Sequence, residues 1–364
     1  MQLLSSARSV YERIWGLFYY TIGCVGLFTA CSSSSAPVDP NTPDFSFVVI
    51  GCNRIDKADT TGSVSTANIE QLNRTFTEVA NLSPKPAFLF FAGDMVFGYT
   101  ADTVRLAQEL TGWKALYQAS PLAGSGVELV PIPGNHETQN ASKVAYVAAE
   151  RTWVRTMGTM LLRAGNGPAA GGADNLQTDQ SKLTYSFDYR GTHFVLLNTD
   201  PTGYDWRVPA KWVATDVSAA RAAGARHVFA IGHKPAYAYP TTPTDGLSFY
   251  PTERDAFWTA LLSGQAEAML SAHDHVYWRT RPAAGKTWQI IAGNGGSLLE
   301  PTIDASITPP GKYYGFTVVT VTKGGTVYAK SYGRDVPAAG YVSSSTAYPT
   351  TIRDSVDITW LHGG

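Results

Sequence analysis

The sequence predicts an α/β fold in which two β-sheets pack together and helices cover them. Short apolar runs rich in β-forming residues alternate with segments in which apolar residues recur at spacings of three and four, as in an amphipathic helix. This alternation favours a largely parallel sheet with covering helices. Further apolar runs late in the chain predict a second sheet. Most of the early runs end in a glycine and a polar residue, at the strand ends where α/β sheets bind ligands.

The expected elements follow from these two periodicities. In the first half, strands are predicted at 45–50, 87–91 and 127–132, with helices at 69–79 and around 106–113. The second half predicts helices at 143–162 and 209–224, a hairpin of 184–189 with 193–198, and strands at 227–231, 268–271, 289–292, 316–322 and 326–332. Ser65 or Thr66 is the expected N-cap of the first helix.

The bulk composition limits the class of protein. With 364 residues, 44% of them hydrophobic and 16% charged, the chain can bury one large core. A formal net charge of -1, without a basic stripe, argues against polymeric nucleic acid as a partner. We therefore expect one main domain over residues 44–335, followed by a tail at 336–364 that packs on the domain or trails it.

Residues 1–30 predict a lipoprotein signal peptide. An uncharged apolar stretch over residues 14–30 follows two arginines, and small residues precede Cys31. Cys31 would be lipidated and would anchor the protein in a bacterial cell envelope, facing the periplasm or the exterior, with 31–43 as a Ser- and Pro-rich tether. The alternative is an uncleaved membrane anchor. Only Cys52 then remains in the folded body, so no internal disulfide is expected there.

Polar side chains follow five of the expected strands. They are Cys52 to Arg54, Asp94, Asn135 with His136, His233, and His273 with His275. Taken singly, an aspartate after a strand is commonly a turn residue and one histidine is commonly an interior residue with satisfied hydrogen bonds. Their succession at strand ends instead predicts a single site. Because carboxylate, amide oxygen and imidazole suit zinc, iron or manganese, one or two divalent or trivalent metal ions are the expected cofactor.

In this order the motifs resemble those of the calcineurin-like metallophosphoesterases, also called the purple-acid-phosphatase-like fold. The resemblance covers about 45–332 and rests on Gly93-Asp94, Gly134-Asn135-His136-Glu137, Gly232-His233 and Ala272-His273-Asp274-His275. It implies a four-layer metallophosphoesterase sandwich, with two mixed β-sheets flanked by helices. It also implies the ligand roles: Asp94 bridges two metal ions, Asn135, His233 and His273 complete the second site, and His275 belongs to the first. His136 would not bind metal and would assist the leaving group.

The first motif departs from the family pattern. The family usually places Asp-x-His after the first strand, where this chain has Cys52 and Arg54. Arg54 cannot ligate a metal because its guanidinium stays protonated, but it could hold a phosphate oxygen in a fork. Cys52 is either a thiolate ligand that favours zinc or iron, or an inert buried thiol that leaves the first site with only Asp94 and His275. Asp56 is a nearby oxygen donor whose ordinary role is that of a loop carboxylate.

A metal-dependent phosphoesterase is therefore the expected function. It would hydrolyse a phosphomonoester or phosphodiester by metal-activated hydroxide, with His136 serving the leaving group. The substrate would be a small-molecule or a glycan- or lipid-linked phosphoester, with specificity in loops such as 166–179 and 241–246. The alternative is a catalytically impaired or one-metal protein that binds a phosphate ligand, because Cys52 and Arg54 replace the usual residues.

Overall fold

The computed structural model describes residues 39–55, 68–282, 285–299, 312–335 and 349–360. Contacts divide the chain into two units, Met1–Pro37 and Val38–Gly364, and the fold below is that of the second. The predicted signal peptide with Cys31, the N-cap at Ser65 or Thr66, and Asp56 lie outside the described residues. Among the helices of the described segments, none has the length and apolar character needed to cross a membrane.

The first sheet contains six strands in the order β12-β11-β10-β1-β2-β3. Strands β1, β2 and β3 run parallel to one another, while β10, β11 and β12 pair antiparallel. The carboxyl ends of β1, β2 and β3 therefore point to the same edge. The strands span Pro43–Ile50 for β1, Phe88–Ala92 for β2, Glu128–Ile132 for β3, Tyr314–Thr322 for β10, Val327–Arg334 for β11 and Thr351–Asp357 for β12.

The second sheet also contains six strands, in the order β4-β5-β6-β7-β9-β8. Its four central strands are parallel, and the edge strands β4 and β8 pair antiparallel to their neighbours. Both sheets are thus mixed, with a parallel part that gathers strand ends at one edge. The strands span Tyr185–Tyr189 for β4, Thr192–Leu197 for β5, His227–Gly232 for β6, Ala268–Ser271 for β7, Tyr277–Thr280 for β8 and Trp288–Ala292 for β9.

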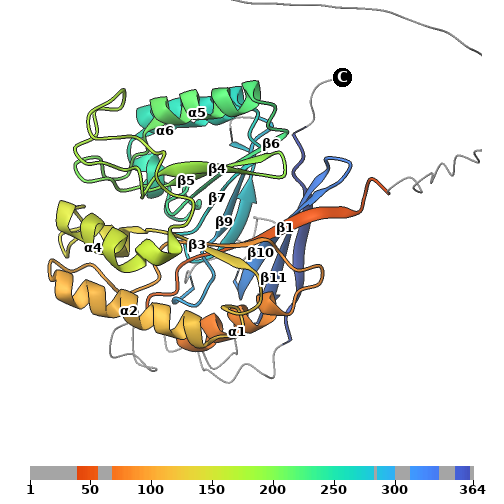
Figure 1. Cartoon of the computed structure of the whole chain (residues 1–364), viewed down its shortest axis with the longest axis horizontal. Helices are drawn as coiled ribbons and strands as arrows, with labels where there is room; N and C mark the ends of the chain where they lie inside the picture. Colours follow the sequence, from red (N-terminus) through yellow and green to blue (C-terminus); the bar gives the residue numbers. More distant parts are fainter. Residues whose placement is uncertain (1–38, 56–67, 283–284, 300–311, 336–348, 361–364) are drawn as a thin grey trace, which may run out of the picture. The chain divides into compact units, whose positions relative to one another are not determined.

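Helices lie on the outer faces of the two sheets (Figure 1). Helices α1 (Asn68–Ala80), α2 (Thr103–Ala119) and α4 (Val147–Met157) pack on the first sheet, and α5 (Ala210–Ala222) and α6 (Pro251–Ser263) pack on the second. Three short helices lie in the connections: α3 (Asn135–Thr138), η1 (Gly158–Met160) and η2 (Gly246–Phe249). The order of layers is helix, sheet, sheet, helix.

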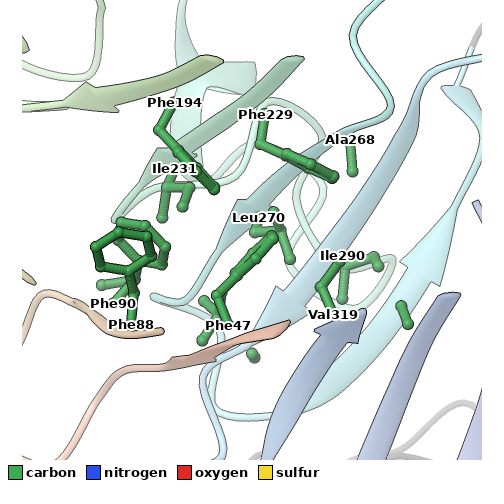
Figure 2. Packing of buried hydrophobic residues seen from close by; sticks show 14 of the residues in the cluster. Phe47, Phe88, Phe90, Phe194, Phe229, Ile231, Ala268, Leu270, Ile290 and Val319 are labelled. Atoms are coloured by element: carbon green, nitrogen blue, oxygen red, sulfur yellow. The ribbon is translucent and has the colours of Figure 1, made fainter. Parts of the chain in front are cut away.

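Aromatic side chains fill the space between the two sheets (Figure 2). The ring of Phe47 on β1 lies 5.1 Å from the ring of Phe194 on β5 and 5.1 Å from that of Phe229 on β6. All three side chains are fully buried. Since burying one such ring contributes roughly 1.5–3 kcal/mol, this layer holds the sheets against each other and brings their strand ends together.

The predicted fold class is confirmed: two mixed six-stranded sheets are flanked by helices. The helix predicted at 143–162 is wrong at both ends, because the observed helix spans only Val147–Met157. Lys143 instead has a φ of 59° and lies in a turn, where its N–H donates to the Asn140 carbonyl. Helix α6 and strands β8 and β12 were not predicted. Strand β12 carries only two apolar residues, Ile352 and Val356, and so lacks the alternation that marks a half-buried strand.

Candidate metal site

The site lies where strand ends of the two sheets meet. Backbone hydrogen bonds join these ends: the Gly51 N–H donates to the Ala292 carbonyl at 3.0 Å, and the Cys52 N–H donates to the Gly93 carbonyl at 3.0 Å. Gly93 has a φ of 81°, and a Cβ there would lie 2.6 Å from Nδ1 of His233. Only glycine therefore lets the end of β2 approach the end of β6 this closely.

Four metal-ligating atoms follow one another across this junction. Oδ1 of Asp94 lies 3.1 Å from Nε2 of His233, which lies 3.2 Å from Nδ1 of His273. The same His273 nitrogen lies 3.0 Å from Oδ1 of Asn135. Ligand atoms bound to one ion at about 2.1 Å have separations of this size. The structure thus brings together the four residues predicted for the second site.

The hydrogen bonds of His233 and His273 determine which ring nitrogen of each is free to bind a metal ion. Nδ1 of His233 lies 2.7 Å from the Ala92 carbonyl oxygen, and Nε2 of His273 lies 3.0 Å from a carboxylate oxygen of Asp245. Each oxygen accepts, so both rings donate outward and their inward nitrogens carry lone pairs in the neutral state. Burial lowers the pKa of His233, but the carboxylate of Asp94 raises it above its usual value overall. A cation bound here would replace that proton, so the donor set fits a metal ion.

Asn135 is oriented by Tyr99, a residue that the sequence did not single out. The Asn135 amide nitrogen donates to the Tyr99 hydroxyl, which directs the amide oxygen towards His273. The Tyr99 ring also packs on the His136 ring, with centroids 3.9 Å apart. Tyr99 has a φ of 45°, a backbone conformation that side chains rarely adopt. Aromatic residues near loops are common, so no pattern in the sequence distinguished this one.

A buried carboxylate, Glu137, holds the two central motifs together. It accepts the N–H groups of Asp94 at 3.0 Å, Gly134 at 2.7 Å and Val96 at 3.0 Å. Burial, reinforced by the nearby charge of Asp94, raises the pKa of Glu137 to about 7. Its position three residues after Gly134 lets one side chain join the ends of β2 and β3, so we interpret it as a positioning residue.

His136 lies beside the ligands and not among them. Its Nδ1 contacts the Phe97 carbonyl oxygen at 2.5 Å, and its Nε2 lies 3.7 Å from Oδ2 of Asp94. Burial lowers the pKa of His136 to about 3 despite the opposing effect of Asp94. The ring is therefore neutral near pH 7, with Nε2 on the side of Asp94. Its predicted role at the leaving group stays a prediction.

Arg54 binds Asp94 with a two-point fork. Its Nε and Nη2 lie 3.1 and 3.0 Å from Oδ2 of Asp94, the oxygen that does not contact His233. The backbone N–H groups of Asn53 and Arg54 also donate to the Asp94 carbonyl, at 2.8 and 2.9 Å. The predicted phosphate contact of Arg54 stays a prediction, and the fork seen here is directed at Asp94.

The residues predicted for the first site, Cys52, Asp94 and His275, are brought together, with ligand-type atoms that all lie within 4.8 Å of one another. The Cys52 sulfur accepts the backbone N–H of His273 at 3.1 Å. Burial, with the nearby charge of Asp94, raises the pKa of the Cys52 thiol well above its ordinary value. Nδ1 of His275 lies 2.6 Å from the Leu298 carbonyl oxygen. Metal ligation by Cys52 stays a prediction, and in this geometry the sulfur has a structural contact with the His273 N–H.

The fold is the metallophosphoesterase fold: a two-sheet sandwich, here with carboxylate, amide and imidazole side chains at the strand ends. The chain belongs to the calcineurin-like phosphoesterase family, whose model matches residues 45–277. The family implies a phosphoesterase in the general sense and divalent metal ions as its cofactor. The curated proteins compared with the chain include no match.

Solved structures share the fold at low sequence identity. A purple acid phosphatase, PPD1, from yellow lupin seeds is 16% identical with a TM-score of 0.59, over 88% of this chain and 54% of the lupin chain. A dimetal phosphatase from Danio rerio is 14% identical with a TM-score of 0.54, over 87% of this chain and 99% of that chain. This chain thus spans about half the length of the lupin phosphatase.

Proposed function

We propose that this chain hydrolyses a phosphomonoester or phosphodiester, using a metal ion held by Asp94, Asn135, His233 and His273. The observation that carries the proposal is the run of four ligating atoms with successive separations of 3.0–3.2 Å, supplied by four separate strand ends. An ion bound there would act as a Lewis acid on water and on a phosphoryl oxygen.

The remaining side chains supply complementary chemistry. The Arg54 guanidinium brings a permanent positive charge beside Asp94, and its side chain is 22% exposed, so a phosphate at the site would lie close to a cation. His136 lies next to Asp94 as a neutral imidazole. The negative charge of a bound phosphate would raise the pKa of His136, so that the ring could hold a proton and donate it to a leaving-group oxygen.

Hydrolysis of a chromogenic aryl phosphate tests the proposal. The wild type, loaded with zinc, manganese or iron, should turn over and His136→Ala should lower kcat by about 10²–10⁴-fold while keeping its metal. His193→Ala serves as a matched control, because His193 is also a buried histidine but lies between Asp188 and Asp216. If wild type and His136→Ala are equally inactive with every metal, the proposal fails.

A second candidate is a protein that binds a phosphate ligand at one metal without turnover. The fork of Arg54 on Asp94 favours it, because Oδ2 is already engaged by a cation where a first metal would otherwise bind. It predicts one metal ion per chain and saturable binding of inorganic phosphate with no hydrolysis. Turnover of the aryl phosphate separates this candidate from the first one, and elemental analysis with phosphate calorimetry separates it from a two-metal enzyme.

We also propose that the protein acts at a membrane surface on a small-molecule or a glycan- or lipid-linked phosphoester. The support is the sequence around Cys31, which resembles a lipoprotein signal ending at a lipidated cysteine. Mass spectrometry of the amino-terminal peptide should find a diacylglyceryl group on Cys31. Cys31→Ser should shift the protein out of the envelope membrane fraction, and an unmodified Cys31 would contradict the anchor.

A further inference from the structure

Asp245 is the side chain that determines how one predicted ligand presents itself to the metal. It lies in the loop between β6 and α6, and its Oδ1 contacts Nε2 of His273 at 3.0 Å. Neither the predicted ligand set nor the family motifs contain Asp245. The His273 side chain is 9% exposed and that of Asp245 is 36% exposed, so Asp245 lies on the solvent side of His273.

His273 differs from the neighbouring histidines in what holds its outer nitrogen. The rings of His233, His275 and His136 each contact a backbone carbonyl, at Ala92, Leu298 and Phe97. His273 instead contacts a carboxylate. A carboxylate accepts more strongly than a carbonyl, and it raises the basicity of the opposite nitrogen of the ring it binds.

The contact fixes both the tautomer and the direction of the His273 ring. Because the carboxylate accepts, Nε2 carries the proton and Nδ1 is left with its lone pair. Nδ1 then faces Oδ1 of Asn135 at 3.0 Å and Nε2 of His233 at 3.2 Å, where a metal ion would bind. Loss of the carboxylate would allow the other tautomer, in which Nδ1 carries a proton and cannot ligate.

The backbone lies in the left-handed region at His273 and at Gly246, the residue after Asp245. His273 has a φ of 70°, an uncommon conformation for a residue with a side chain, and its N–H is bound by the Cys52 sulfur. Asp245 is held in turn by the N–H of Gly246, at 2.7 Å from its Oδ1. Gly246 has a φ of 58°, and a Cβ there would lie 2.7 Å from the Pro235 carbonyl oxygen.

We propose that Asp245 is a positioning residue for the metal: it orients His273 through Nε2 so that Nδ1 is the ligand, and it thereby makes the β6–α6 loop part of the metal site. The inference deepens the proposed function and rests on a metal binding at His273. It assigns Asp245 to the layer behind the ligands and gives it no contact with the reacting phosphate.

Metal affinity, measured without substrate, is the test. Cobalt(II) is titrated into metal-free wild type, Asp245→Asn, Asp245→Ala and Asp245→Glu, with visible spectra recorded throughout. We expect Asp245→Asn and Asp245→Ala to weaken cobalt binding by about 10–100-fold with an altered d–d spectrum, and Asp245→Glu to recover affinity in part. Asp255→Asn is the control, because Asp255 is a 60%-exposed carboxylate on α6 that forms an ion pair with Arg254.

Three results would overturn the inference. Equal cobalt affinity and spectra in Asp245→Ala and Asp255→Asn would remove any link between Asp245 and the metal. Asp245→Asn could instead lose one whole equivalent of metal with the remaining spectrum unchanged. Asp245 would then be a ligand of a separate ion together with Asp274, whose carboxylate lies within 4.8 Å of the ligand-type atoms of Asp245 and His273. A metal-free Asp245→Ala that is already unfolded by circular dichroism, with Asp245→Asn normal in affinity, would reduce Asp245 to a stability residue.

The proposed function can fail independently of this result. If Asp245 controls cobalt affinity but the wild type hydrolyses no phosphoester, the positioning role stands and the hydrolase proposal does not. If the wild type hydrolyses aryl phosphate but Asp245→Ala has unchanged metal affinity, the hydrolase proposal stands and the positioning role does not.

Discussion

The two halves of the metal cluster share Asp94 but differ in what faces its carboxylate. At the second site, Oδ1 of Asp94 faces the imidazole of His233, at the start of a run of ligating atoms. At the first site, Oδ2 faces the guanidinium of Arg54, a donor that cannot give up its proton. The second half therefore presents a donor set that would suit a cation, whereas the first half already contains the guanidinium cation of Arg54.

This difference indicates how a two-metal scaffold can carry one metal. A carboxylate that bridges two ions needs two positive charges around it, and a guanidinium can supply one of them with fixed geometry. The remaining first-site groups, Cys52 and His275, then have structural contacts to the His273 N–H and the Leu298 carbonyl. We expect one tightly bound metal ion per wild-type chain.

Removal of a second-site ligand should have the largest effect. His233→Ala should lose the metal and at least about 10³-fold of any hydrolytic rate, because it deletes a ligand and leaves Asp94 without its imidazole partner. His227→Ala is the control: His227 is buried at the other end of β6 and bonds to Glu267. The measurements are elemental analysis and kcat/KM, and equal metal content in the two variants would contradict the assigned ligand set.

Restoration of the family's first motif should allow the first half of the cluster to bind a metal ion. Cys52→Asp combined with Arg54→His removes the guanidinium and supplies an oxygen and a nitrogen ligand, so we expect the metal content to rise from one to two equivalents. Cys52→Asp alone keeps Arg54 on Asp94 and should stay at one. Two equivalents in the wild type would break the comparison, since the first half would then bind metal despite Arg54.

The role of the Cys52 sulfur gives a smaller effect. If it only accepts the His273 N–H, Cys52→Ala should cost about 1–3 kcal/mol of unfolding free energy from the lost buried contact, while the cobalt(II) stoichiometry is kept. The cobalt-loaded wild type should show no sulfur-to-cobalt charge-transfer band. Such a band, absent from Cys52→Ala, would identify the sulfur as a ligand.

His193 lies outside the metal cluster and gives a contrast with its two halves, because its contribution to the stability of the fold should depend on pH without any metal. Burial lowers the pKa of His193, but hydrogen bonds to Asp216 and Asp188 raise it above 6.5 overall. A folded-state pKa above the unfolded value stabilises the fold below about pH 6.5, and that stability is lost as the pH rises through the folded-state pKa.

His193→Gln should therefore cost about 1 kcal/mol more at pH 6 than at pH 9, a figure reduced because Asp188 is largely exposed. Urea unfolding at both pH values measures it, and chelation of metal should leave the difference unchanged. An equal loss at the two pH values would show that the ring acts by packing and not by charge.

The placement of the four predicted second-site residues at strand ends was predictable from local patterns. Asp94, Asn135, His233 and His273 each follow an apolar run, and the motif order resembles one family, so four strand ends could be assigned to one site. Elements without a strong period were missed: β12 is a polar edge strand, and α6 has apolar residues that give no clear amphipathic stripe.

By itself, the sequence determined the fold class and placed the predicted second-site residues at strand ends, because apolar periodicity and a residue's place after a strand are local properties. The tertiary structure decided which partner each side chain meets. Arg54 reaches Asp94, the Cys52 sulfur accepts from His273, and Asp245 binds the outer nitrogen of that histidine. These contacts join segments 40, 221 and 28 residues apart. Parallel pairing of β1 with β2 brings Arg54 to Asp94, and parallel pairing of β6 with β7 brings the loop of Asp245 to His273. Face-to-face packing of the two sheets brings the Cys52 sulfur to the His273 N–H.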